Sequence, residues 1–279
     1  MESEPKHVSS GLLTLVSIVT LLVLWWLVSL AAGDNKAGEP NVPSIVDIAN
    51  SAKRLGYYWQ GGLGVKSTET GGELTWAGAG LAFAYNSMVT LVRMFAGLAL
   101  GTIVGVVVAV AISWSNLLRR MFVLPAHIAR MLPMLALLPL FALWFGSSEK
   151  GAILFVGFAT FVLIFAFTLS AIDAASPHYE HSARSLGASR LRAYLSVVVP
   201  SILPRLRPAF LLSLGFAWSA VIAAEFLGQQ HGLGQITNLA QFYGRTNILA
   251  LVAAIVVVYA AITYSLAQSI LHHVTRWAE

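Results

Sequence analysis

The stretch HYEHSARSLGASRLRAYLSVVVPSILP, residues 178–204, separates two apolar runs of a chain that is otherwise strongly hydrophobic. Ser176 is a good helix N-cap, and Pro177 fits the first helical position that follows it. Glu180 would then lie in the first turn, where a carboxylate complements the helix dipole. Gly187 suits the position just past a helix end. The stretch therefore begins with a short helix that ends at a glycine.

A second short helix is expected directly after this glycine, because Ser189 can cap it. Its apolar residues recur at the spacing of one helix face and form a stripe, whereas Arg190 and Arg192 point elsewhere; the stripe is Leu191, Tyr194, Leu195 and Val198. Helices this short are marginal alone in water. We expect them to dock onto a separate cytoplasmic protein. The alternative is a basic loop that only sets topology, which explains the arginines but not the caps.

The composition identifies the class of protein. The chain has 279 residues, 57% of them apolar and 10% charged, with a mean hydropathy of +0.76. Such a chain is predicted to be an integral membrane protein. Its net charge of +5 is spread over several loops, so nucleic acid is not an expected partner. The absence of cysteine excludes disulfides, thiolate metal sites and cysteine nucleophiles.

A membrane-spanning helix needs about 20 apolar residues, because lipid offers no partner for backbone amides. The first apolar run has this full length and is followed by no small-residue cleavage pattern, so we expect a retained helix rather than a signal peptide. Six runs are predicted to span the membrane: Leu12 to Ala32, Met88 to Ile112, Phe122 to Phe145, Ala152 to Ile172, Phe210 to Leu227 and Ile248 to Leu271.

The distribution of arginine predicts the orientation. With a cytoplasmic N-terminus, the cytoplasmic loops contain most of the arginines, as the positive-inside rule requires: Arg119, Arg120, Arg184, Arg190, Arg192, Arg205, Arg207 and Arg276. The sequence thus predicts an all-α bundle of six helices with both termini inside. Its parts are a cytoplasmic N-terminus (1–11), a first helix (12–32), an extracytoplasmic segment (33–85) and a core domain (86–279) with a cytoplasmic loop at 173–205.

The extracytoplasmic segment is expected to contain an interfacial helix. Ser44 and Asp47 follow Pro43 in the manner of a helix start, and apolar residues then recur at helical spacing. Its later part is rich in glycine and flanked by Trp59 and Trp76, which suits a loop at the headgroup level. No strand precedes these glycines and no Lys-Ser/Thr follows them, so a phosphate-binding loop is not predicted.

Small residues mark one face of the second span. Gly97, Gly101 and Gly105 recur every four residues, so another helix backbone can approach closely. We expect ordinary packing within one bundle, with a subunit interface as the alternative.

Prolines and charges mark the third span and its neighbours. Pro125, Pro133 and Pro139 each remove a backbone donor, so the third span should be bent and partly unwound. Arg93 and Arg130 lie within spans, where a charge either faces the interior or reaches an interface. The sequence leaves both possibilities open. Near the end of the fifth span, Glu225 is the remaining candidate partner for a cation or a gate.

No catalytic, cofactor-binding or metal site is predicted. His127 is isolated, and the adjacent His272 and His273 point to different helix faces, so neither has the i, i+4 spacing of a metal site. The chain has no G-x-S-x-G, no H-E-x-x-H and no P-loop. It therefore resembles a conduit more than an enzyme.

The cytoplasmic loop resembles the EAA loop of permease subunits from binding-protein-dependent ABC importers. Ala183, Gly187 and Pro200 match its spacing, whereas His181 and Ser182 replace its Glu and first Ala. Further motifs are similar to the nitrate, sulfonate and taurine branch of this family from about residue 86 onward: LPMLALLPLFALWFG with Glu149 after it, RSLGASR, WSAVIAAEFLG and HGLG. The segment 33–80 is longer than in the family.

This resemblance implies a type I importer permease of the bacterial inner membrane, acting as a homodimer with two cytoplasmic ATP-binding subunits and an extracytoplasmic solute-binding protein. ATP and Mg would bind only to the partner subunits, and the solute would be small and often anionic. The implied ATPase-coupling residues are Glu180, His181, Ala183, Gly187, Ala188, Ser189, Arg190, Leu191, Leu195 and Pro200. The implied path or gate residues are Arg130, Trp144, Trp218 and Glu225.

Two other functions were compared with this one. A self-contained secondary transporter or channel would need a coupling site at mid-membrane and often an internal repeat, and the sequence offers neither. An intramembrane enzyme would need the catalytic motifs that are missing.

Overall fold

The computed structural model describes residues 10–175 and 177–278, and its regular elements over these residues are all helices. The predicted N-terminal segment 1–11 lies mostly outside the described residues. Among the described residues, five helices are long and apolar enough to cross a membrane, or six if a bent pair counts as one span, which confirms the all-α membrane class. The long helices are α1 (Ser10–Ala31), α3 (Trp76–Ser113), α6 (Glu149–Asp173), α9 (Val199–Phe226) and α11 (Thr246–Thr275).

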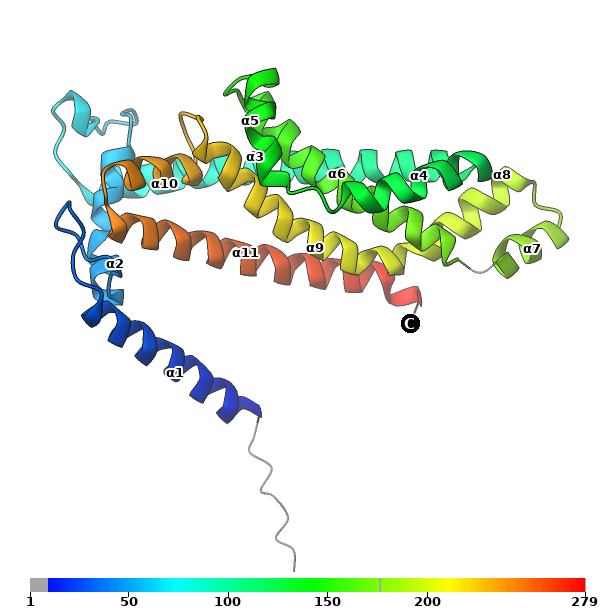
Figure 1. Ribbon diagram of the computed structural model, residues 1–279, viewed down its shortest axis with the longest axis horizontal. Coiled ribbons are helices and arrows are strands. Elements are labelled where there is room, and N and C mark those ends of the chain that lie inside the picture. Colours follow the sequence, from blue (N-terminus) through cyan, green and yellow to red (C-terminus); the bar gives the residue numbers. More distant parts are fainter. Residues whose placement is uncertain (1–9, 176, 279) are drawn as a thin grey trace, which may run out of the picture. The chain divides into compact units, whose positions relative to one another are not determined.

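The third span is broken into two helices, α4 (Asn116–Ala129) and α5 (Met134–Phe145), which meet at 99°. The break falls at Pro133, because proline lacks an N–H and disfavours helical geometry in the residue before it. Figure 1 shows α4 beside α6, after which the chain turns into α5. The predicted bend is confirmed at this proline, whereas Pro125 and Pro139 lie inside helices.

The chain divides into two compact units, residues Met1–Phe83 with Thr237–Ala254 and residues Ala84–Ile236 with Ile255–Glu279. In the first unit, helix α2 (Ile45–Ser51) starts with a capping box between Ser44 and Asp47, as predicted. A 3-10 helix over Ala52–Tyr58 continues it, and a 3-10 turn at Thr68–Thr70 follows. Helix α3 begins at Trp76, so its first turns lie within the segment predicted as extracytoplasmic.

Within the first unit, residues 35–57 contact the turn that precedes α11. The Asn35 amide donates to the Gly244 carbonyl at 2.7 Å, and the Thr246 hydroxyl donates to the Pro40 carbonyl at 2.6 Å. The Arg245 guanidinium lies 4.8 Å from the centre of the Tyr57 ring. The segment is therefore a folded part of the protein, although it precedes most of the apolar spans.

The second unit is built around α6, which is buried along most of its length. The glycine stripe of α3 faces this helix. A Cβ at Gly101 would collide with the Thr160 hydroxyl, and one at Gly97 would lie 2.5 Å from Val156 Cβ. Because glycine has no Cβ, the two backbones can approach closely. The structure thus places these glycines in packing within one bundle.

Helix α9 packs along α6, and both contribute to the main apolar core with α3 and α5. Trp218 lies inside this core, where its indole donates to the Thr263 hydroxyl at 3.0 Å and stacks on Tyr259. A second cluster joins α4 to α6 through Ala126, Phe165 and Leu169. Near the end of α6, Arg119 of α4 also pairs with Asp173 at 3.1 Å.

The second helix predicted after Gly187 begins where it was expected, but it does not end before the fifth span. After α7 (Pro177–Ser185), the chain forms α8 (Arg190–Ala193), a π-helical turn over Tyr194–Val198 and then α9 without interruption. Pro200 is the second residue of α9 and directly follows the π turn. A proline has no N–H to donate to the preceding turn of helix, and the local departure from α-helical bonding lies next to it.

Candidate functional site

A buried polar network lies where α3, α6 and α9 meet. Arg93 of α3 is 1% exposed and donates to Glu225 Oε1 at 2.8 Å, to Glu149 Oε2 at 2.6 Å and to the His231 carbonyl at 2.7 Å. A second guanidinium nitrogen also pairs with Glu149. One buried arginine therefore joins the start of α6 to the end of α9.

Glu225 is fully buried and is stabilised by several donors besides Arg93. The Thr90 hydroxyl and the Gly234 backbone N–H each donate to Glu225 Oε2 at 2.9 Å. Gly234 belongs to the first turn of α10 (Leu233–Phe242), so the carboxylate also meets the positive end of that helix. Buried charge is tolerated here because it is paired and hydrogen-bonded.

Side chains of α3 complete the start of α10. Asn86 Oδ1 accepts from the Gly232 N–H at 2.7 Å, and Thr90 Oγ1 accepts from the Leu233 N–H at 2.9 Å. The His231 ring lies edge-on to Tyr85 with ring centres 5.1 Å apart. The backbone donors that a helix start leaves unbonded thus have partners on a neighbouring helix.

The sequence had identified part of this network. Glu225 was a candidate partner for a cation, and the cation is Arg93, which faces the interior and does not reach outward. Asn86, Thr90, Glu149 and His231 had no predicted role here, although Glu149 and the HGLG motif were noticed. An arginine within a span and a glutamate within another are the signal that could have paired them.

Arg130 lies at the break between α4 and α5, beside a cavity of about 590 Å³. Its guanidinium carbon is 5.8 Å from the centre of the Phe167 ring. Arg130 is the charged side chain among the residues that line this cavity, which also include Leu132, Pro133, Met134, Leu135, Phe155, Ala159, Leu212, Gly215, Phe216, Ser219 and Ala220. An apolar cavity with one cation suits a small anion.

The four predicted path residues are not brought together. Glu225 belongs to the buried network, Arg130 lines the cavity, Trp144 is exposed on α5, and Trp218 is held in the core. Trp218 does not line the cavity, because its indole is turned toward α11.

The segment between α6 and α9 forms an elbow, which we define as residues 177–198. Gly187 has φ +88°, and its N–H donates to Arg184 O at 3.0 Å while the Ala188 N–H donates to Ala183 O at 3.1 Å. This left-handed glycine ends α7 as predicted. The Arg192 N–H donates to the Ser189 hydroxyl at 3.3 Å, which confirms the predicted cap.

The predicted apolar stripe is divided. Tyr194 and Val198 are buried, and the Tyr194 hydroxyl donates to the Val110 carbonyl of α3 at 3.3 Å. Leu191 and Leu195 are 54% and 49% exposed, and Leu186 beside the glycine is 89% exposed. The side chains of Glu180, His181 and Arg190 lie outside the described part. The elbow is therefore held to the bundle by Tyr194 and Val198, whereas Leu191 and Leu195 remain exposed on its surface.

A family model described as "Binding-protein-dependent transport system inner membrane component" matches residues 97–277. The chain is 29% identical over 170 residues to the taurine transport system permease protein of Escherichia coli strain K12, which covers 61% of this chain and 62% of that protein. It is 26% identical over 189 residues to a putative aliphatic sulfonates transport permease protein of Bacillus subtilis strain 168, covering 68% of each.

The chain spans less than two thirds of the length of the taurine relative. Among solved structures, an inward-facing form of the MetNI methionine ABC transporter superposes with a TM-score of 0.60 at 20% identity. That match covers 72% of this chain and 99% of the other. This structural match shows a similar fold in a protein of lower sequence identity than the relatives named above.

Proposed function

Because this chain belongs to the inner membrane components of binding-protein-dependent transport systems, we propose that it is the permease subunit of an ATP-driven importer. It would form the translocation path with a second copy of itself. Two cytoplasmic ATP-binding subunits would hydrolyse ATP with Mg, and an extracytoplasmic binding protein would deliver the solute. The chain itself would act as the conduit and carry no catalytic residue.

The observation that carries this proposal is the elbow. Leu186, in the turn before Gly187, and Leu191 and Leu195, at the start of the helical run into α9, are exposed apolar side chains. A groove on an ATP-binding subunit would cover these leucines. The proposal therefore places the elbow in the cytoplasm, which requires both chain termini to lie inside.

The continuity of the helix after the elbow supports mechanical coupling. The chain runs from α8 through the π turn into α9, which lines the Arg130 cavity and ends at Glu225. A displacement of the docked elbow would therefore be transmitted along α9 to both sites. Closure of the ATP-binding pair would move the bundle from inward-open toward outward-open, and hydrolysis would reverse the movement.

A small anion is the proposed solute. Arg130 gives the cavity a positive charge within apolar walls. The similar permeases of E. coli and B. subtilis are named for taurine and aliphatic sulfonates, which are small anionic or zwitterionic compounds. With taurine as the probe, Arg130→Gln should lower uptake severalfold and Arg130→Lys should retain most of it. Equal uptake by all three proteins would contradict the role of this charge.

Co-purification tests the importer assignment. Leu191→Asp or Leu195→Asp should release the ATP-binding subunit when the chain is extracted in detergent and captured, because a carboxylate cannot be buried in an apolar groove. Leu63→Asp, at an 83% exposed leucine of the outer segment, is the matched control and should retain the subunit. Failure of the native chain to capture any ATP-binding subunit would favour a self-contained transporter or channel.

A further inference from the structure

We propose that the α5–α6 turn (residues 146–149) and the α9–α10 turn (residues 227–232) form a latch that closes the outer end of this permease. The latch would release when the importer opens outward. This inference rests on the proposed function, because only a permease that alternates its access needs such a release.

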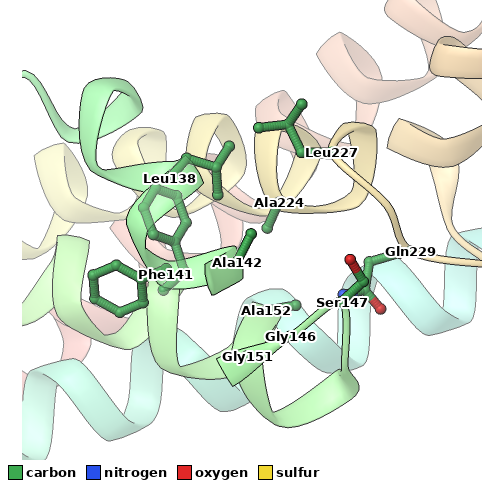
Figure 2. Close-up of a pocket in the computed structure, with 11 residues that line it drawn as sticks. Leu138, Phe141, Ala142, Gly146, Ser147, Gly151, Ala152, Ala224, Leu227 and Gln229 are labelled. Carbon is green, nitrogen blue, oxygen red and sulfur yellow. The ribbon is translucent and has the colours of Figure 1, made fainter. Parts of the chain in front are cut away.

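The two turns meet along a thin seam. The Gln229 side chain donates to the Ser148 carbonyl at 3.1 Å, and a Cβ placed on Gly228 would lie 2.6 Å from the Ser147 hydroxyl. Behind the seam is a cavity of about 20 Å³, bounded by α5, α6 and α9. Figure 2 shows Ser147 and Gln229 side by side at one edge of it, with Ala152 and Ala224 nearby.

Arg93 adds ion pairs to the contact between the two turns. Breaking its pair with Glu225 would cost more free energy than breaking its pair with Glu149. Glu225 is fully buried, so removal of its cation would leave an uncompensated charge in the core. Glu149 is 61% exposed, so water can solvate its carboxylate after the pair separates. The Arg93–Glu149 pair is therefore the one that can open, while Arg93 and Glu225 stay together.

The backbone around α5 is suited to such a release. This helix begins at the 99° break and ends at Gly146, which has φ +67°. Gly146 tolerates this conformation without a Cβ penalty. Helix α5 is thus bounded by a break at each end, and Met134 and Leu135 at its start line the Arg130 cavity. Movement of α5 away from α9 would join this cavity to the outer side.

A thiol-accessibility experiment tests the latch, and the chain has no natural cysteine to interfere. Ala152 is buried behind the seam, so Ala152→Cys should react slowly with a membrane-impermeant maleimide. Adding Glu149→Gln should raise the labelling rate severalfold. Adding Glu39→Gln, which breaks the exposed pair with Arg54, should leave the rate unchanged. Ala166→Cys, buried deeper on α6, should stay unreactive throughout.

A disulfide provides a second arm that leaves Glu149 intact. A Cβ on Gly228 would lie 3.3 Å from Ser147 Cβ, close to the separation of about 3.5–4.5 Å found in disulfides, and the turn must relax from its φ of +131° to accept a cysteine there. In the complex with its ATP-binding subunits, ATP with orthovanadate should raise the labelling of Ala152→Cys. Oxidation of Ser147→Cys with Gly228→Cys should suppress that rise and a reductant should restore it, with the label on the peptide that contains position 152 measured separately from the label on the two other thiols.

The two arms separate the latch from the proposed function. The Glu149→Gln arm needs no nucleotide, so unchanged labelling of Ala152→Cys in that background would overturn the latch whatever partner the chain has. A labelling rise under ATP and orthovanadate that survives the disulfide would also overturn it. Recovery of the chain without any ATP-binding subunit, together with a rise caused by Glu149→Gln, would overturn the importer assignment and keep the latch.

Discussion

The network around Arg93 and the elbow around Gly187 differ in how their polar and apolar groups are satisfied. At Arg93, the charges are buried and paired by residues of the same chain, from α3, α6, α9 and the start of α10. At the elbow, three leucines are exposed. The first region is completed by the chain's own fold, whereas the second has an apolar surface that a partner protein would complete.

This contrast indicates that the Arg93 network stabilises the bundle and that the elbow serves to bind a partner. A buried ion network is costly to disturb because an unpaired charge would be left in the core. An exposed apolar surface can be altered with little effect on the fold of the bundle. Substitutions at the two sites should therefore separate stability from assembly.

The largest expected effect is at Arg93. Arg93→Met leaves Glu225 buried without its cation, which should lower the free energy of unfolding by about 3–5 kcal/mol. Thermal unfolding of the detergent-purified protein measures this loss. The control is Arg119→Met, which breaks a partly exposed pair with Asp173 and should cost at most about 1 kcal/mol. Equal losses of unfolding free energy in both variants would show that the buried network stabilises the protein no more than a partly exposed ion pair does.

The next effect concerns the glycine stripe, which brings α3 close enough for Arg93 to reach its partners. Gly101→Val would force a side chain into Thr160 and should destabilise the bundle by about 1–3 kcal/mol. Gly80→Val on the same helix is the control, since no atom lies within 4 Å of its Cβ position. The same thermal measurement compares them. Similar stability of the two variants would argue against close packing of α3 on α6.

At the elbow, Gly187→Leu places a side chain on a residue with φ +88°, which should cost about 1–2 kcal/mol locally. The bundle should keep its thermal stability and membrane insertion, because this strain lies outside the core. Uptake and stimulation of the ATP-binding subunit should be lost. Normal uptake by this variant would contradict a role of the elbow in coupling to the ATP-binding subunit.

The smallest effect is expected at α2, a short helix that is capped within its own unit. Ser44→Ala should cost about 1 kcal/mol of local stability, seen as faster amide hydrogen exchange in α2. The Ser44 hydroxyl and N–H donate to Asp47 and lower its pKa, so this contribution is present above the ordinary value of 3.8 and is lost as the pH falls through the lowered pKa. Protection factors that stay the same when the Asp47 carboxylate is titrated to its protonated form would contradict this contribution.

The elements that the sequence predicted well depend on local chemistry. The apolar spans follow from length and composition, since a lipid environment leaves helix as the available structure. The capping box at Ser44, the left-handed glycine at 187 and the break at Pro133 each follow from one or two residues. Such features need no knowledge of distant contacts.

The elements that the sequence missed depend on long-range packing. The sequence predicted where the second elbow helix begins but not that Tyr194 and Val198 are buried and that the helix continues into α9. The sequence likewise did not indicate that the indole of Trp218 donates to Thr263 of α11. In both cases the neighbour that decides the orientation lies on another helix.

The sequence by itself determined a helical membrane protein with a glycine-hinged elbow, because hydropathy, helix caps and proline act through the residues next to them. Only the tertiary structure decided that Arg93 faces Glu149 and Glu225, and that the elbow continues into α9. A charge within a span must find a partner or reach an interface, and its own sequence neighbourhood does not say which. That choice depends on how closely the helices pack, and here the glycines of α3 set this distance.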